Sequence, residues 1–177
     1  KRKLFSAGIR EIIEALYAAS AAGVKIELII RGICCLKVGI PHISENISVR
    51  SIVGNFLEHA RIFYFYNDGA EELYMGSADW MPRNLDKRVE IVFPLKDEKI
   101  KQQAKHILDI QLADNLKAHI LQPDGSYEKI DKRGKKTLIC AQDYFCEEAV
   151  KNAKQPTDPV LDHVFIPAEA GVFSDRD

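Results

Sequence analysis

Side chains that could handle a phosphate group lie at the ends of the strands predicted between residues 31 and 90. In chain order they are Arg31, His59, Arg61, Ser77, Arg88 and Glu90. A guanidinium is permanently charged and donates hydrogen bonds in pairs, which suits phosphate oxygens. A histidine beside such cations can hold or donate a proton near neutral pH. Together these residue types predict a phosphate-handling site.

The same residue types also have ordinary structural uses. A lone histidine beside a strand is more often a surface or hydrogen-bonded residue, and an arginine at a strand end is usually solvated. Neither common glycine-rich phosphate motif occurs in the sequence. Spacing alone therefore predicts an α/β domain with a phosphate site and leaves its chemistry open. We interpret His106 and His119 as structural, His42 as a solvated loop residue and Trp80 as a core or lid anchor, while His163 falls in the tail.

The charge balance argues against large anionic partners. Lys and Arg together number 25 against 26 Asp and Glu, giving a net charge of −1 over 177 residues. Such a chain has no overall attraction to nucleic acid or to an anionic membrane, so any anion-binding surface must be local. The four cysteines lack zinc-site spacing and indicate a reducing, cytoplasmic compartment. No apolar run reaches the ~18 residues that span a bilayer.

Alternating helical and strand patterns must position these side chains. Apolar spacing predicts helices over 9–22, 96–114 and 141–154, with a short helix over 51–58. Branched and aromatic runs predict strands over 24–30, 61–66, 73–77, 88–93, 117–121 and 127–130. The intervening segments 32–50 and 78–87 are expected to be loops, and 67–69 a tight turn. Residues 155–177 are expected to form an extended tail.

Four runs of sequence, in this order, resemble a known family. They are IIRGICCL at 29–36, SENI at 44–47, SIVGNFLEHAR at 51–61 and GSADWMPRNLDKRVE at 76–90. The series resembles the C-terminal catalytic domain of bacterial polyphosphate kinase, the ATP–polyphosphate phosphotransferase. The resemblance covers about residues 9–154. The chain begins without Met or a signal segment, and we expect it to be a piece of a longer enzyme.

The resemblance implies a fold and an activity. The fold is a phospholipase D-like α/β/α sandwich with a mixed β-sheet, formed by residues 1–154. The activity is the reversible transfer of the terminal phosphate of ATP to polyphosphate through a phosphohistidine. That histidine belongs to the preceding domain of the family's enzyme, which is absent here. This domain would supply nucleotide-phosphate contacts and a second catalytic histidine.

The resemblance also assigns roles to residues. His59 matches the family's second histidine, and Glu90 lies where its catalytic carboxylate is expected. The phosphate-binding residues implied are Arg31, His59, Arg61, Ser77 and Arg88. The phospholipase D pattern is His-x-Lys followed by an Asp, so Arg61 replaces the lysine here, and Asp79 stands near the place of the aspartate.

Substrates and partners follow from the same resemblance. ATP or ADP and polyphosphate would be the substrates, with Mg²⁺ held by ligands in the absent preceding domain and none in this chain. Expected partners are the upstream domains and a second copy in a homo-oligomer, with no nucleic acid and no transmembrane segment. The full-length enzyme would be cytoplasmic, with peripheral association at the membrane as a further expectation.

Two other functions stay open at this point. The chain could be a phosphate- or nucleotide-binding module without turnover of its own. It could also be a phospholipase D-like phosphodiesterase, which would need a second histidine motif from another copy. Because the nucleophilic histidine is missing, we expect the isolated chain to fold but to be inactive.

Overall fold

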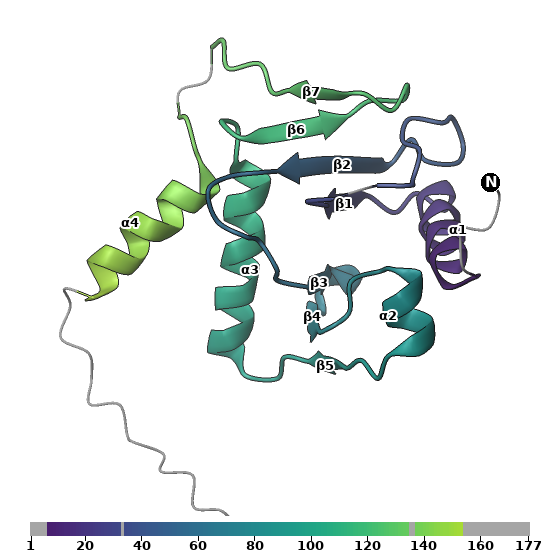
Figure 1. Ribbon diagram of the computed structural model, residues 1–177, viewed down its shortest axis with the longest axis horizontal. Coiled ribbons are helices and arrows are strands. Elements are labelled where there is room, and N and C mark those ends of the chain that lie inside the picture. Colours follow the sequence, from purple (N-terminus) through teal and green to yellow (C-terminus); the bar gives the residue numbers. More distant parts are fainter. Residues whose placement is uncertain (1–6, 33, 135–136, 154–177) are drawn as a thin grey trace, which may run out of the picture.

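The computed structural model describes residues 7–32, 34–134 and 137–153 of the chain. Helices and strands are interspersed along these ranges, with one 3₁₀ turn (Figure 1). The helices are α1 (Ala7–Ala21), α2 (Pro82–Lys87), α3 (Glu98–Ala113) and α4 (Ala141–Ala153), and the 3₁₀ turn η1 is Asn67–Gly69. The strands are β1 (Ile26–Ile29), β2 (Ile47–Ile52), β3 (Ile62–Phe65), β4 (Glu72–Gly76), β5 (Val92–Pro94), β6 (Ala118–Leu121) and β7 (Tyr127–Lys129).

The strands form two sheets. The larger has the order β1-β2-β6-β7, in which β1 pairs parallel with β2 and the remaining pairs are antiparallel. The smaller sheet, β3-β4-β5, is antiparallel throughout. The predicted α/β class with a mixed sheet is therefore confirmed. Helix α3 links the two sheets, since it follows β5 and leads into β6 (Figure 1).

Each sheet has its own apolar core. Val49 and Leu121 belong to a buried cluster in the larger sheet, against which Leu16 and Tyr17 of α1 pack. In the smaller sheet, Leu73 lies in a buried cluster that includes Ala104 of α3. Burial of apolar area at about 25 cal/mol per Å² makes these two clusters the main source of stability. The spacing of apolar residues that predicted α1 and α3 therefore corresponds to the faces with which these helices pack on the two clusters.

The segment around β2 differs from the prediction. A loop over 32–50 and a helix over 51–58 were expected. The end of the loop and the helix are both wrong, because residues 47–52 form a strand and residues 53–58 contain no helix. Ile47, Val49 and Ile52 are buried in that strand, which has a partner on either side. Two ladders of backbone hydrogen bonds outweigh the weak helical spacing of a short apolar run.

Two other boundaries moved. The segment 78–87, expected to be a loop, contains helix α2, which begins at Pro82, where a proline's missing N–H costs nothing. The strand predicted over 88–93 begins only at Val92, and Val89 is fully exposed. The remaining predicted helices and strands are confirmed with small shifts at their ends. The expected tail lies outside the described residues, and no helix within them is long and apolar enough to cross a membrane.

Candidate functional site

Most of the predicted site residues gather at one edge of the smaller sheet. Because the sheet is antiparallel, the starts of β3 and β5 lie at the same edge as the end of β4. The Gly76 N–H donates to the Arg61 carbonyl at 3.0 Å, and the Ser77 N–H donates to the Ile91 carbonyl at 3.0 Å. The segments that flank the three strands are thereby held side by side. This edge carries His59, Arg61, Ser77, Asp79 and Glu90.

His59, Arg61 and Asp79 form one polar cluster. The Arg61 Nε and Nη2 both donate to Asp79 Oδ1, at 3.1 and 2.8 Å. Arg61 Nη2 also lies 2.9 Å from His59 Nε2, and Nη1 donates to the His59 carbonyl at 3.0 Å. A guanidinium can only donate, so this contact is a hydrogen bond only when His59 Nε2 accepts. The second contact of His59 Nε2 is Asp79 Oδ2, 4.0 Å away.

Exposure differs sharply within this cluster. The Arg61 side chain is 18% exposed, whereas the His59 side chain is 62% exposed. The partly buried cation is fixed by the carboxylate behind it, and the imidazole faces solvent in front of it. Such an arrangement can hold an anion against His59 with the charge of Arg61 close by. It can also move a proton to or from that anion, because imidazole is the side chain suited to this near neutral pH.

Asp79 is itself held by the start of α2. The Asn84 Nδ2 donates to the Asp79 carbonyl at 3.2 Å, and the Met81 N–H donates to the same oxygen at 2.6 Å. Asn84 is buried, and its Oδ1 has no hydrogen-bond partner among the described residues. The helix that was expected to be a loop therefore positions the carboxylate of the cluster.

Ser77 and Glu90 form a second pair at the same edge. The Ser77 Oγ donates to Glu90 Oε2 and accepts the Ile91 N–H at 3.1 Å. The described contacts of the Glu90 carboxylate are therefore with the serine. The carboxylate that touches the guanidinium beside His59 is Asp79. The role of Glu90 as the catalytic carboxylate stays a prediction.

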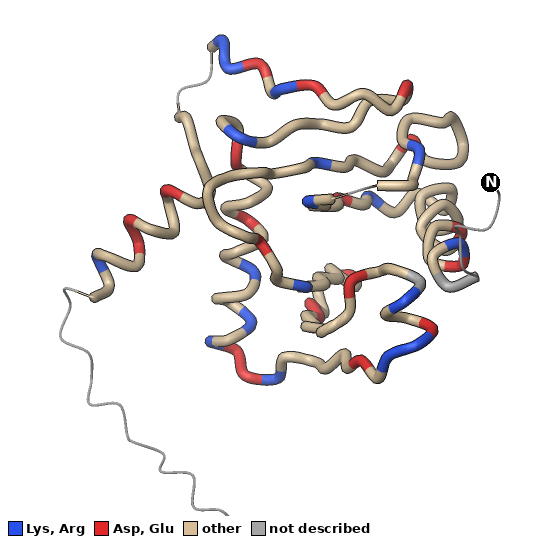
Figure 2. The backbone as a smooth tube through the Cα atoms, viewed as in Figure 1, with Lys and Arg blue, Asp and Glu red and all other residues tan. Residues whose placement is uncertain are grey.

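Arg31 and Arg88 are exposed and stand apart from these contacts. Arg31 follows β1 in the larger sheet, and Arg88 follows α2. Within the described ranges neither side chain takes part in an ion pair or a hydrogen bond. Helix α2 contributes Arg83 and Lys87, so basic side chains are concentrated there (Figure 2). That Arg31 and Arg88 bind phosphate together with His59 stays a prediction.

Two glutamines to which sequence reasoning gave no site role contact the segment that carries His59. Gln142 and Gln111 both donate to the Glu58 carboxylate, at 3.0 and 3.3 Å. Gln142 lies 84 positions from Glu58 along the chain. A glutamine on an amphipathic helix gives no sequence signal for such a contact.

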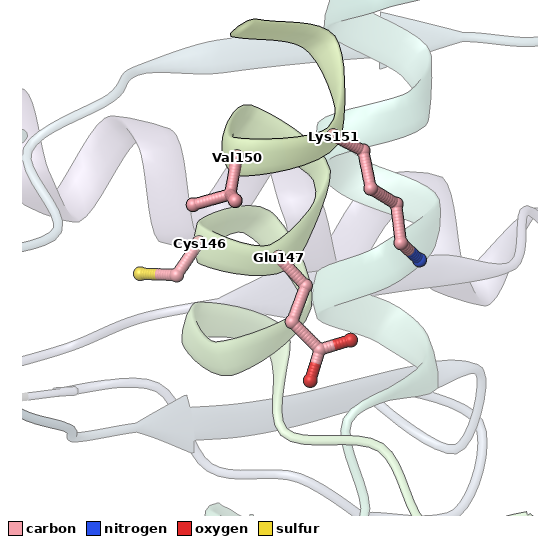
Figure 3. A pocket seen from close by; sticks show the side chains of 4 residues that line it. All are labelled: Cys146, Glu147, Val150 and Lys151. Atoms are coloured by element: carbon pink, nitrogen blue, oxygen red, sulfur yellow. The ribbon is translucent and has the colours of Figure 1, made fainter. Parts of the chain in front are cut away.

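Cysteine and metal chemistry find little support among the described residues. All four cysteines are free thiols, and burial raises the pKa of Cys34 and of Cys140, which disfavours their reactive thiolates. No group of three or more His, Cys, Asp or Glu side chains is placed to hold a metal ion in the part of the chain described. The pocket in Figure 3 is lined by α4 alone, at Cys146, Glu147, Val150 and Lys151. With every lining residue on one helix, the described residues give it no opposite wall.

Comparisons with known proteins agree on one family. Residues 3–142 match the family described as Polyphosphate kinase C-terminal domain 2. The chain is 49% identical over 170 residues to a polyphosphate kinase of Lactiplantibacillus plantarum, covering 94% of the chain and 24% of that relative. It is 52% identical over 151 residues to one of Synechocystis sp., covering 85% of the chain and 20% of the relative.

A solved structure gives the same result. The crystal structure of polyphosphate kinase from Porphyromonas gingivalis superposes with a TM-score of 0.75 at 39% sequence identity. The match covers 81% of the present chain and 22% of that protein. The chain thus spans about a quarter of the length of the relatives it matches.

Proposed function

Because the chain belongs to the polyphosphate kinase C-terminal domain 2 family, we propose that it forms one half of a phosphotransferase site. The reaction is the reversible transfer of the terminal phosphate of ATP to polyphosphate. The other half of the site, including the histidine that becomes phosphorylated, would come from residues outside this chain. The observation that carries the proposal is the exposed imidazole of His59 resting on the fixed guanidinium of Arg61.

The roles of the residues follow from the demands of phosphoryl transfer. The transferred group spreads negative charge over its oxygens, so catalysis consists mainly of positioning and cationic stabilisation. Arg61 supplies a fixed positive charge, and Asp79 keeps its fork oriented. Arg31 and Arg88, exposed and without ion-pair partners among the described residues, are free to bind the phosphates of the nucleotide.

His59 would handle the proton. Protonation of His59 Nε2 would break the hydrogen bond that it accepts from Arg61. The resulting imidazolium can then donate a hydrogen bond or a proton to the oxygen of the leaving nucleoside diphosphate as its bond to phosphorus breaks. General acid catalysis of this kind typically contributes about 10²- to 10⁴-fold to a rate. Glu90 and Ser77 would shape the second side of the site, with Ser77 fixing the carboxylate.

The described residues do not fit a Mg²⁺ site. Mg²⁺ prefers an octahedral set of oxygen ligands, usually one or two carboxylates with waters and phosphates. Here the Asp79 carboxylate is occupied by Arg61, and the Glu90 carboxylate by Ser77. This cluster is arranged for an anion, and any magnesium ligands of the reaction would lie elsewhere in the longer enzyme.

One alternative has a specific observation in its favour. Since the chain spans about a quarter of its relatives, it could bind nucleotide without any turnover of its own. Such a module would bind ATP at His59 but would not restore activity to the rest of an enzyme.

A chimera distinguishes the two functions. The chain replaces the matching region of the L. plantarum polyphosphate kinase, and polyphosphate synthesis from ATP is measured. We expect the chimera to be active and His59→Asn to lower the rate about 10²- to 10⁴-fold. The matched control is His42→Asn, an exposed histidine whose positive φ of 60° suits asparagine. An active chimera in which both substitutions have equal effects would contradict the proposal, and ATP binding without synthesis would favour the module.

A further inference from the structure

The segment between β2 and β3 carries His59 but is not held by its own side chains. Residues 53–60 contain no helix or strand. Phe56 and Leu57 are 58% and 67% exposed, so burial of apolar area does not fix the backbone there. After β2 the chain loops past the start of α4 and across α3 on its way to β3 (Figure 1). Contacts with these two helices must therefore hold it.

Gln142, the second residue of α4, makes two hydrogen bonds to the backbone of this segment. Its Oε1 accepts the Phe56 N–H at 3.0 Å, and its Nε2 donates to the Phe56 carbonyl at 2.8 Å. One side-chain amide thus satisfies both polar groups of one peptide residue, as a neighbouring strand would. Gln142 is itself buried. A buried pair of hydrogen bonds is expensive to break, because each group left unpaired keeps its desolvation cost.

Gln142 also makes a hydrogen bond to Glu58, the residue next to His59. The Gln142 Nε2 also donates to Glu58 Oε1 at 3.0 Å, while the Gln111 Nε2 donates to Glu58 Oε2 at 3.3 Å. Each oxygen of the carboxylate therefore has its own amide donor. The described residues give Glu58 no cationic partner, so the two glutamines alone orient it. Because Phe56 and Glu58 are both fixed, the backbone position of His59, and so the direction of its side chain, is restricted.

Gly54 makes room for this amide. A Cβ at Gly54 would lie 2.2 Å from Gln142 Oε1 and 2.7 Å from its Cδ. Any side chain at this position would push the amide out of place. A substitution at Gly54 therefore disturbs the same hydrogen bonds without changing Gln142 itself.

Helix α4, which carries Gln142, is itself held against α3. The Ala141 N–H donates to Asp114 Oδ2 at 2.8 Å, which ties the start of α4 to the end of α3. Further along α4, Glu148 Oε1 lies 2.9 Å from His106 Nε2 of α3. The start of α4 and the end of α3 therefore form one base, and Gln142 projects from it.

We infer that Gln142 is a positioning residue for His59. It acts through the Phe56 backbone and the Glu58 carboxylate and does not touch the reacting phosphate. The inference rests on the proposed function, since it concerns where the imidazole is held during transfer. A displacement of a catalytic group by about 1 Å can cost about 10²-fold in rate. Loss of the hydrogen bonds of Gln142 should therefore lower kcat measurably.

The test uses the chimera with two variants that disturb the amide differently. Gln142→Met keeps the volume of the side chain and removes only its hydrogen bonds, while Gly54→Ala displaces an intact amide. The matched control is Gln103→Met, the same change at an exposed position of α3. For both variants we expect kcat to fall about tenfold or more while KM for ATP changes less than about threefold. The control should keep the wild-type kcat.

A second readout separates positioning from simple loss of stability. In the 177-residue chain, NMR signals of the His59 ring should broaden or shift in both variants, while amide signals of β2 and β6 stay in place. Wild-type kcat in both variants, whatever their melting temperatures, would overturn the inference. That result together with an inactive His59→Asn chimera would leave the proposed function intact, whereas an active His59→Asn chimera would remove the proposed function itself. If one variant does not fold, the other decides.

Discussion

Replacing Asp114 by asparagine should destabilise the chain by about 3 kcal/mol, because this buried carboxylate joins α3, β6 and α4. Asp114 is 1% exposed. Its Oδ1 accepts three backbone N–H groups, from Leu116 at 3.1 Å, Lys117 at 2.8 Å and Ala118 at 3.0 Å. Its Oδ2 accepts the N–H of Ala141 at 2.8 Å.

The magnitude follows from what asparagine can and cannot accept. Its carbonyl oxygen can keep the three bonds to residues 116–118, but without the negative charge. Its NH₂ group would face the Ala141 N–H, so one hydrogen bond to a charged group, worth about 1.5–3 kcal/mol, is lost and two donors confront each other. Weakening of the other three bonds brings the total to about 3 kcal/mol. For a chain of this size, that lowers the melting temperature by about 6–12 °C.

Thermal unfolding followed by circular dichroism measures this effect. The control is Asp109→Asn on the same helix, whose exposed carboxylate pairs with Lys105 at 3.5 Å. An exposed pair of this kind contributes about 0.3–0.5 kcal/mol, so the control should shift the melting temperature by 2 °C at most. Equal shifts for the two variants would refute the view that Asp114 joins the three elements.

Two further predictions concern the smaller sheet. The Tyr64 hydroxyl donates to Glu71 at 2.7 Å, and this bond raises the pKa of Tyr64 to about 12. The stability that this bond contributes is present below about pH 10 and should be lost between pH 10 and 12, because the tyrosine of the unfolded chain ionises first. Urea unfolding of Tyr64→Phe should show a smaller loss of stability over that range. An unchanged loss would contradict the assignment. Ser77→Ala removes the acceptor of the Ile91 N–H and the donor to Glu90, so it should lower the free energy of unfolding in urea by about 1 kcal/mol, and a change below about 0.3 kcal/mol would count against this contact.

Local patterns along the chain predict most of the elements. The long helices α1 and α3 are recognisable because their apolar residues pack against the two buried clusters. Helix α4 contributes to neither cluster, and its buried residues are Ala141 and Gln142 at its start. Strand β2 is not recognisable, because its identity depends on partners far away in the sequence. It pairs with β1 on one side and with β6 on the other, and local spacing carries neither contact.

The candidate site divides in the same way. His59 and Arg61 are two positions apart just before β3, so their closeness follows from the sequence, although their contact is visible only in the structure. Asp79 joins them only through the antiparallel sheet, 18 positions from Arg61. Gln142 reaches the site through a helix contact that no residue type announces. Charged residues at strand ends are visible in the sequence, but the groups that orient them are visible only in the fold.

A crystal structure of the chain with a non-hydrolysable ATP analogue tests the central claim most directly. The account predicts triphosphate oxygens at hydrogen-bond distance, about 2.7–3.2 Å, from His59 Nε2 and from at least one of the guanidinium groups of Arg61 and Arg31. A triphosphate bound on another face of the molecule, with His59 still paired only to Arg61, would contradict it.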